Sequence, residues 1–172
     1  MNQTSKQFRS LAVSLSSRGF GYAVMEGGSA LILYGKMIIN QDKNARALAH
    51  IEKLITRKQP DVLVLQDVNA KGTRRNPRIK ELHRQVVTLA KQHKIKVVKI
   101  AGTELRNTLL GNPKGTKQEM AKTLAKQFPD ELASRLPPKR KPWASEDTRM
   151  GIFDAVALAL ALRIKVPRHL SP

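Results

Sequence analysis

The chain has 172 residues and carries 32 lysines and arginines against 13 aspartates and glutamates, a formal net charge of +19. Hydrophobic residues make up 41% of the sequence, which argues against a disordered polycation and predicts one globular domain. Cysteine is absent, which excludes disulfides and thiolate metal sites. No apolar run reaches the ~18 residues of a membrane span, so we expect a cytoplasmic protein with no membrane partner. The excess of positive charge predicts a polyanionic partner, most often nucleic acid.

The positive charge is concentrated in two segments. Residues 71–122 hold 14 lysines and arginines against three acids, and the stretch PPKRKPW at 137–143 holds three more cations. Such side chains contact phosphate groups and bind nucleic acid without choosing a sequence, whereas the alternative is a solvated helix face with its loops. We expect nucleic-acid contacts from Lys71, Arg74, Arg75, Arg78, Arg106, Lys114, Lys117, Lys139, Arg140 and Lys141.

Aromatic residues make up only 4% of the chain, which argues against an open platform that stacks successive bases. Contact with the nucleic-acid backbone is the better interpretation. Trp143, the one tryptophan, falls in the second basic segment. It either stacks on a base or anchors its loop, and anchoring is the interpretation that we favour.

The hydrophobic pattern predicts three strands near the start of the chain. Leu11, Val13 and Leu15 alternate with smaller residues, which is the period of a strand. Glycines between the apolar runs indicate tight turns, so the three strands form an antiparallel meander. The expected strands are 9–17, 20–26 and 30–40, and the expected turns are Arg18-Gly19 and Gly27-Gly28.

Helices and buried strands alternate after the meander. An apolar stripe predicts a helix over 44–59, and the nearly continuous apolar run 61–68 is typical of a parallel strand covered on both faces. The later elements are a helix over 77–93, a strand over 95–101, a helix over 115–128, a basic connector over 137–146 and an apolar helix over 149–164.

This order predicts an α/β fold of three layers. We expect a mixed five-stranded sheet, with three antiparallel and then two parallel strands, between helices on both faces. The expected domain covers residues 9–166, with a disordered polar tail over 1–8 and a second tail over 167–172.

The order of elements and four local strings resemble the RNase H-like superfamily, and within it the RuvC type of Holliday-junction resolvase. The strings are LAVSLSSRGFGYAV at 11–24, PDVLVLQDV at 60–68, KVVKIAGTELRNTLLGNPKGTKQEMAKTLAKQF at 96–128 and MGIFDAVALALAL at 150–162. In the third string, Arg106, Thr108 and Gly111 stand near the places of a basic family motif. The resemblance implies an RNase H-like fold and DNA rather than RNA as partner. It also implies a homodimer, and phosphodiester hydrolysis by carboxylates that hold two Mg²⁺ or Mn²⁺ ions.

Two positions depart from the pattern that the resemblance implies. Ser14 stands where the family has an Asp, and Gln66 stands where it has a Glu. A neutral side chain cannot replace a carboxylate that bridges two dications. Asp67 is adjacent to Gln66, but on a regular strand it points to the opposite face, and only a bulge would re-aim it.

The last helix keeps one acid of the pattern, Asp154, among apolar neighbours. A carboxylate in such surroundings usually has a partner, either a metal or an arginine such as Arg149 or Arg18. Two further acids, Glu146 and Asp147, either share the face of Asp154 or cap the helix N-terminus. The candidate catalytic acids are Asp154, Asp147, Asp67 and Glu146, and the candidate metal ligands are Asp154, Asp147 and Asp67.

Three functions are compatible with these observations. We favour a nucleic-acid-binding protein with a resolvase-like fold and a degenerate metal site, which binds branched or duplex DNA. The second is an active Mg²⁺- or Mn²⁺-dependent junction endonuclease with a relocated carboxylate site. The third is a basic structural nucleic-acid-binding protein that keeps the fold as a scaffold, since fold alone does not fix function.

Overall fold

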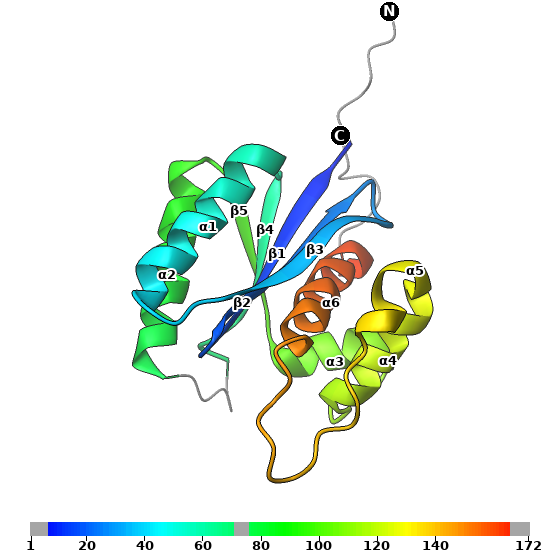
Figure 1. The fold of residues 1–172 in the computed structure, drawn as a ribbon. Coiled ribbons are helices and arrows are strands. Elements are labelled where there is room, and N and C mark those ends of the chain that lie inside the picture. The colour runs from blue at the N-terminus through cyan, green and yellow to red at the C-terminus, as the bar shows by residue number, and fades with distance from the viewer. Residues whose placement is uncertain (1–6, 71–75, 166–172) are drawn as a thin grey trace, which may run out of the picture.

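Five strands form one mixed sheet in the computed structural model, which describes residues 7–70 and 76–165 (Figure 1). The spatial order is β3-β2-β1-β4-β5. The central β1 (Arg9–Ser16) pairs antiparallel with β2 (Gly19–Glu26), which pairs antiparallel with β3 (Ala30–Ile38). On its other side β1 runs parallel to β4 (Val62–Gln66), and β4 runs parallel to β5 (Lys96–Ile100). The predicted mixed sheet is confirmed.

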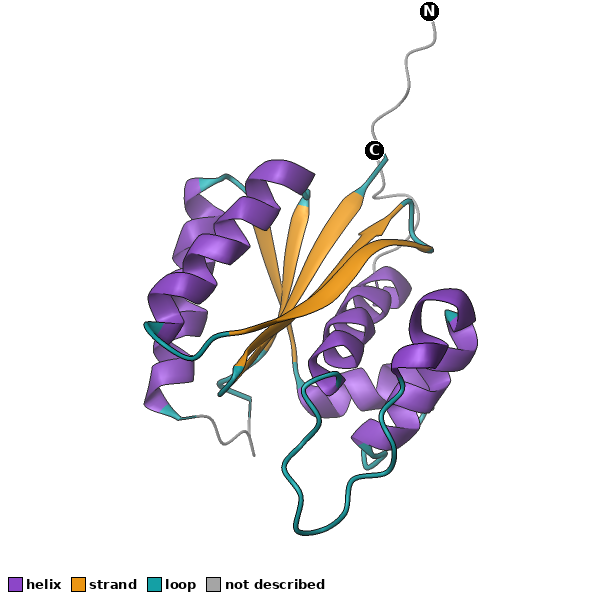
Figure 2. Ribbon diagram, in the orientation of Figure 1, coloured by secondary structure: helices purple, strands orange, loops and turns teal. Residues whose placement is uncertain are grey.

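Helices cover both faces of the sheet, as predicted (Figure 2). On one face lie α1 (Lys43–Lys58) and α2 (Pro77–Gln92). On the other lie α3 (Gly102–Leu110), α4 (Lys117–Gln127), the short α5 (Pro129–Leu132) and α6 (Met150–Lys165). A 3-10 turn over Ala133–Arg135 follows α5, and a long loop then leads into α6 (Figure 1).

Strand alternation divides the core into two layers. On β1, Leu11 and Val13 pack toward α1 and α2, whereas Ala12 packs toward α6. The middle of α6 is buried on all sides, because it lies between the sheet and the helices α3 and α4, and every residue from 155 to 162 is buried. Within the described residues, none of the helices, α6 included, is both long and apolar enough to span a membrane.

Two local features differ from the prediction. The helix α3 was not expected, because Leu105 is its only buried residue and leaves no apolar stripe in the sequence. It ends at Gly111, whose left-handed backbone (φ 68°) closes the helix. The first hairpin turn lies at Ser17-Arg18, one residue earlier than expected, and Gly19 already belongs to β2.

Candidate functional site

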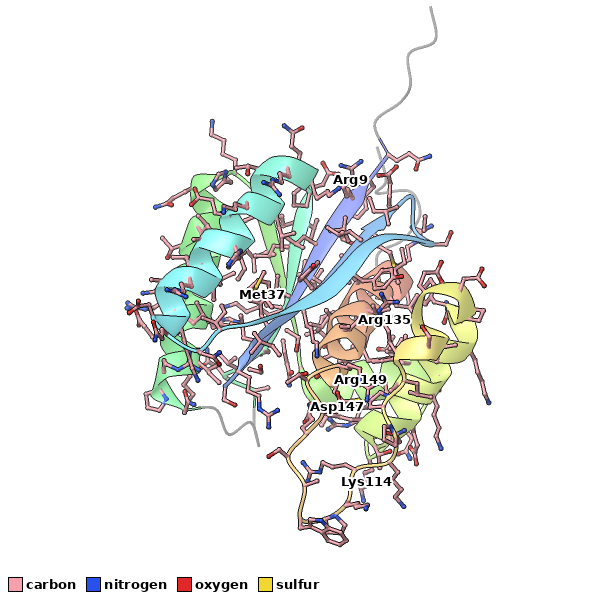
Figure 3. The ribbon with its side chains drawn as sticks, in the orientation of Figure 1. Arg9, Met37, Lys114, Arg135, Asp147 and Arg149 are labelled. Atoms are coloured by element: carbon pink, nitrogen blue, oxygen red, sulfur yellow. The ribbon has the colours of Figure 1, made fainter. Side chains whose placement is uncertain are left out.

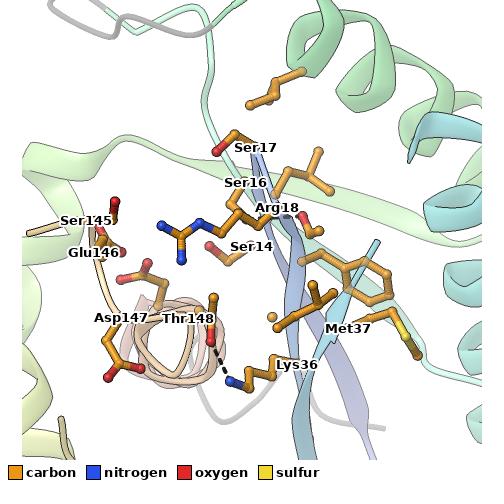
Figure 4. Close-up of a pocket in the computed structure, with 18 of the residues that line it drawn as sticks. Ser14, Ser16, Ser17, Arg18, Lys36, Met37, Ser145, Glu146, Asp147 and Thr148 are labelled. Atoms are coloured by element: carbon orange, nitrogen blue, oxygen red, sulfur yellow. Dashed lines mark hydrogen bonds between the residues drawn. The ribbon is translucent and has the colours of Figure 1, made fainter. Parts of the chain in front are cut away.

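A pocket of about 460 Å³ opens where the first hairpin meets the start of α6 (Figure 4). One row of residues across three strands lines it. Ser14 on β1 lies opposite Gly21 on β2, and Gly21 lies opposite Lys36 on β3. The Nζ atom of Lys36 donates a hydrogen bond to the hydroxyl of Thr148, just before α6 (Figure 4). This row therefore lies on the same side of the sheet as α6.

The start of α6 is held against the sheet by two glycines. A Cβ atom on Gly21 would lie 1.9 Å from the carbonyl oxygen of Gly151, so β2 admits only glycine at this contact. Asp154 follows Gly151 by three residues and therefore lies on the same side of the helix. This places the Asp154 carboxylate in the pocket, with its side chain 17% exposed.

One lysine lies between two acids of the pocket. The Nζ atom of Lys117, at the start of α4, lies 3.1 Å from Oε1 of Glu146 and 3.3 Å from Oδ2 of Asp154. Burial lowers the pKa of the Lys117 amine, but the attraction of Asp154 and Glu146 outweighs burial and the pKa lies above its ordinary value. We call these three residues the Lys117 cluster. Its single ammonium is shared by two acids of the candidate catalytic set.

The third acid of the pocket, Asp147, is bonded to Arg149 (Figure 3). Its Oδ1 atom accepts from the backbone nitrogen of Arg149 at 2.9 Å and from Nε at 3.0 Å, and its Oδ2 atom accepts from the guanidinium at 2.7 Å. These hydrogen bonds outweigh burial and lower the pKa of Asp147 to about 2. The backbone oxygen of Asp147 also accepts from Met150 at 3.0 Å, so this residue closes the turn that begins α6.

Asp67 lies apart from this group of acids. It does not line the pocket. Gln66 ends β4 in regular register with Ile100, so the described pairing contains no bulge that would turn Asp67 toward α6. The Oδ1 atom of Asp67 accepts from the backbone nitrogen of Asn69 at 2.9 Å, which closes a local turn. Gln66, on the α6 side, lies beside Gly102, where a Cβ atom would meet its amide nitrogen at 3.2 Å.

The donor set does not fit a pair of dications. Across residues 7–70 and 76–165, no three histidine, cysteine or acidic side chains are grouped so that they could hold a metal ion. Glu146 and Asp154 share the Lys117 ammonium, Asp147 is bonded to Arg149, and Ser14 is neutral. Magnesium and manganese require oxygen ligands whose negative charge is available to them. In this pocket a side-chain cation occupies the place between the acids.

Of the expected nucleic-acid contacts that the structure describes, Lys117 alone lines the pocket. Arg78 donates to Asn44 Oδ1 at 2.8 Å and to the backbone oxygen of Ser17 at 3.3 Å, which joins α2 and α1 to the first hairpin turn. Arg106 donates to the backbone oxygen of Pro113 at 2.8 Å. The exposed members are Lys114, Lys117, Lys139, Arg140 and Lys141. The expected contacts Lys71, Arg74 and Arg75 lie outside the described residues.

Among the pocket residues absent from the predicted site are Lys36 and Thr148, and Arg18 was considered only as a partner for Asp154. Figure 4 shows the Arg18 side chain extending from the hairpin turn across the pocket toward Ser145 and Glu146. The register of the two hairpins is the signal that finds Lys36, because it puts this lysine in one row with Ser14. Finding that row requires the correct position of both turns.

Solved structures with the same arrangement of strands and helices include known nucleases. RuvC of Thermus thermophilus superposes with a TM-score of 0.67 at 15% identity, over 91% of this chain and 94% of that chain. The yeast mitochondrial Holliday junction resolvase Ydc2 superposes with a TM-score of 0.62 at 12% identity, over 95% and 80%. The fold is RNase H-like, of the RuvC type. The nuclease domain of the large terminase subunit gp2 of bacterial virus Sf6 has a TM-score of 0.55 at 13% identity, over 96% and 91%.

These likenesses show the RuvC-type fold alone, because identity is low throughout. No protein-family model and no curated protein matches the sequence. Thermus thermophilus RuvC has also been solved with a Holliday junction substrate, and that structure superposes with a TM-score of 0.65 at 14% identity, over 91% of this chain and 93% of that chain. In the present chain, which has the RuvC-type fold, all three residues of the Lys117 cluster line the pocket.

Proposed function

We propose that this protein binds branched or duplex DNA on a RuvC-type scaffold and does not cleave it. The observation that carries the proposal is the Lys117 ammonium between Glu146 and Asp154. It supplies, within the chain, the positive charge that a metal-dependent nuclease would take from bound ions. Ser14, which lines the same pocket, adds no negative charge that would attract a metal.

Binding is supported by the charge of the chain and by where its cations lie. A net charge of +19 attracts any polyanion at long range. Arg18 and Lys36 line the pocket itself, and Lys114 lies at the same end of the molecule as the loop before α6 (Figure 3). Cations that contact phosphate groups release counterions, so we expect the affinity to fall steeply with salt.

The ion pairs that the acidic side chains of the pocket make disfavour cleavage. Hydrolysis of a phosphodiester needs a group that activates water and a positive charge that stabilises the leaving oxygen. The carboxylates of Glu146 and Asp154 are paired to an ammonium, and Asp147 is bonded through both of its oxygens to Arg149. None of these pairs provides a carboxylate and a dication acting together on one water.

The proposal is tested by gel-shift and cleavage assays on a four-way DNA junction, a matched DNA duplex and a matched RNA duplex. Each substrate is assayed with EDTA, with Mg²⁺ and with Mn²⁺. We expect salt-sensitive binding of DNA in all three conditions and intact substrates throughout. Metal-dependent cutting that disappears in Asp154→Ala would contradict the proposal and support the endonuclease alternative. Equal affinity for all three nucleic acids would instead support a basic structural protein.

A Ser14→Asp variant, assayed in parallel, tests whether the absence of an acid at position 14 alone limits catalysis. We expect no cleavage from this variant, because Lys117 still occupies the position between the other two carboxylates. Cleavage by Ser14→Asp would show that the serine, and not the lysine, prevents hydrolysis.

A further inference from the structure

The most exposed large hydrophobic side chain among the described residues is Trp143, which is 81% exposed. It lies in the loop over residues 137–145, which extends from the body of the molecule before α6 (Figure 1). The expectation that Trp143 anchors this loop is wrong, because an anchoring side chain would be buried. A tryptophan left in water costs free energy unless a partner covers it, so the position indicates a binding role.

The backbone holds Trp143 at the tip of a tight turn. The backbone nitrogen of Ala144 donates to the oxygen of Lys141 at 3.0 Å, and Pro142 and Trp143 are the two central residues of that turn. Proline fixes its own φ and so limits the conformations of the tip before any partner arrives. A side chain presented in this way loses less entropy on binding than one on an unconstrained loop.

Both ends of the loop are attached to the body of the protein. Gln118 on α4 donates to the backbone oxygen of Pro137 at 3.2 Å. At the other end, Glu146 is held by Lys117, and Lys36 donates to Thr148. These contacts leave the turn with Trp143 as the part that projects from the body.

The charge around Trp143 selects the class of partner. Lys139, Arg140 and Lys141 are exposed, and no acid occurs from residue 132 to residue 145. The Lys141 ammonium lies 5.7 Å from the centre of the Trp143 ring, so the ring and its nearest cation form one surface. An apolar protein partner would have to remove water from three cations, whereas a nucleic acid pairs them with phosphate.

We infer that the loop over residues 137–145 binds nucleic acid through its three cations, with Trp143 stacked on a base whose face is exposed. The inference rests on the proposed nucleic-acid binding. It specifies which part of the nucleic acid the loop recognises, namely a base that is not stacked on both faces. In continuous duplex each base is covered by its neighbours, so exposed faces occur at branch points and unpaired arms, and a long duplex has them only at its two ends. Ser145 lines the pocket only two positions after Trp143, so a branch held at the pocket would present its bases to this loop.

The test uses the intrinsic fluorescence of the full chain, since Trp143 is its only tryptophan. The protein is titrated with a four-way junction, a duplex with unpaired arms and a long blunt duplex of matched length. We expect quenching by the first two and little change with the duplex. Stacking on one base contributes ~1–3 kcal/mol, so Trp143→Ala should weaken junction binding by about fivefold to 150-fold. Trp143→Phe should keep most of the affinity.

Two controls separate this inference from the proposed function. Ile164→Ala removes another exposed apolar side chain, which is 58% exposed on α6, and should leave junction affinity unchanged. If the protein binds the junction but fluorescence and the Trp143→Ala affinity do not change, the inference is wrong and the proposed function stands. An equal loss of affinity for junction and duplex also overturns the inference. Absence of binding to every nucleic acid overturns both.

Discussion

The Nζ atom of Lys117 lies 3.3 Å from Oδ2 of Asp154, although the two residues belong to different helices and are 37 positions apart. The same ammonium lies 3.1 Å from Glu146, so one cation joins α4, α6 and the loop between them. A side-chain ammonium is part of the chain, so each molecule carries this cation at every metal concentration. At this pocket the chain itself therefore supplies a cation that both carboxylates share.

Replacing Lys117 with methionine tests the contribution of this ammonium to stability. The loss leaves the charges of Glu146 and Asp154 without the cation that they share. We expect the free energy of unfolding to fall by about 1 kcal/mol at low salt, near the upper end for ion pairs of partly exposed side chains. Added NaCl should reduce the difference, because salt screens both the attraction and the repulsion. Urea unfolding at two salt concentrations measures it.

Lys122→Met is the matched control for this measurement. Lys122 lies on the same helix and is exposed, but takes no part in the Lys117 cluster. Its replacement should change stability little at either salt concentration. Equal effects of the two substitutions would mean that the Lys117 cluster contributes no net stability.

Metal binding should appear only when the charge of the pocket is changed. In the wild-type chain we expect millimolar Mg²⁺ or Mn²⁺ to leave the melting temperature unchanged. The double variant Ser14→Asp, Lys117→Ala adds a carboxylate in the pocket and removes the competing ammonium. A metal present at 100 times its dissociation constant adds about 2.7 kcal/mol to stability, which is a readily measured rise in melting temperature.

The wild-type protein and the Ser14→Asp variant show which of the two side chains, Lys117 or Ser14, prevents metal binding. A rise in the melting temperature of the wild-type protein with Mn²⁺, but not with Ca²⁺ or Na⁺ at equal ionic strength, would mean that the ammonium does not prevent metal binding. A rise in Ser14→Asp alone would assign the obstacle to the serine.

The pair of Asp147 and Arg149 predicts a stability change in acid. The pKa of Asp147 is lowered to about 2 in the fold from an ordinary value of 3.8. The pair therefore contributes fully above about pH 4, and this contribution is lost as the pH falls toward 2. The side chain of Asp147 is 35% exposed, so we expect about 1 kcal/mol rather than the full value of the shift.

Asp147→Asn isolates that contribution from the other acids of the chain. The amide keeps an oxygen that can accept from the backbone of Arg149 but has no charge to attract the guanidinium. Relative to the variant, the wild-type protein should be more stable at pH 7 and lose that advantage between pH 4 and 2. A constant difference over this range would assign the effect to the turn and not to the ion pair.

The pattern of strands and helices was predictable because the first strand alternates with a period of two, the run 61–68 is nearly continuously apolar, and the helix at 44–59 has an apolar stripe. The same alternation placed Gln66, and not Asp67, on the side of α6. The position of Lys36 was not predictable. Its place opposite Gly21 depends on a register shift between Val24 and Met25 in the second hairpin, and its alignment with Ser14 depends also on the turn at Ser17-Arg18.

The Lys117 cluster lies beyond what local patterns reveal. Lys117 follows Thr116, whose capping box with Glu119 begins α4, and this local signal fixes only where the helix starts. Its contact with Asp154 depends on how α4 packs against α6, which no spacing in the sequence encodes. The exposure of Trp143 was missed for a similar reason, since composition cannot show that a loop projects from the core.

His83 provides a last prediction, on the other face of the sheet. The side chain is 4% exposed on α2, and its Nε2 donates to the backbone oxygen of Gln66 at 3.1 Å. Burial, with a smaller contribution from the charge of Lys99, lowers the pKa of His83 below 6.5 despite the opposing effects of Gln66 and Asp67. Protonation of His83 is therefore easier in the unfolded chain than in the fold.

The sign of the pH dependence follows from this difference. Stability should be complete above about pH 6.5 and decline as the pH falls toward 5, because the unfolded chain binds more protons there. Denaturant unfolding at pH 7.5 and pH 5.5 measures the decline, and His83→Gln should reduce it, since glutamine keeps a hydrogen-bond donor but does not titrate. His93→Gln, at the partly exposed end of α2, is the control and should retain the decline. If His83→Gln declines as steeply as the wild-type protein, the buried imidazole does not control stability in this pH range.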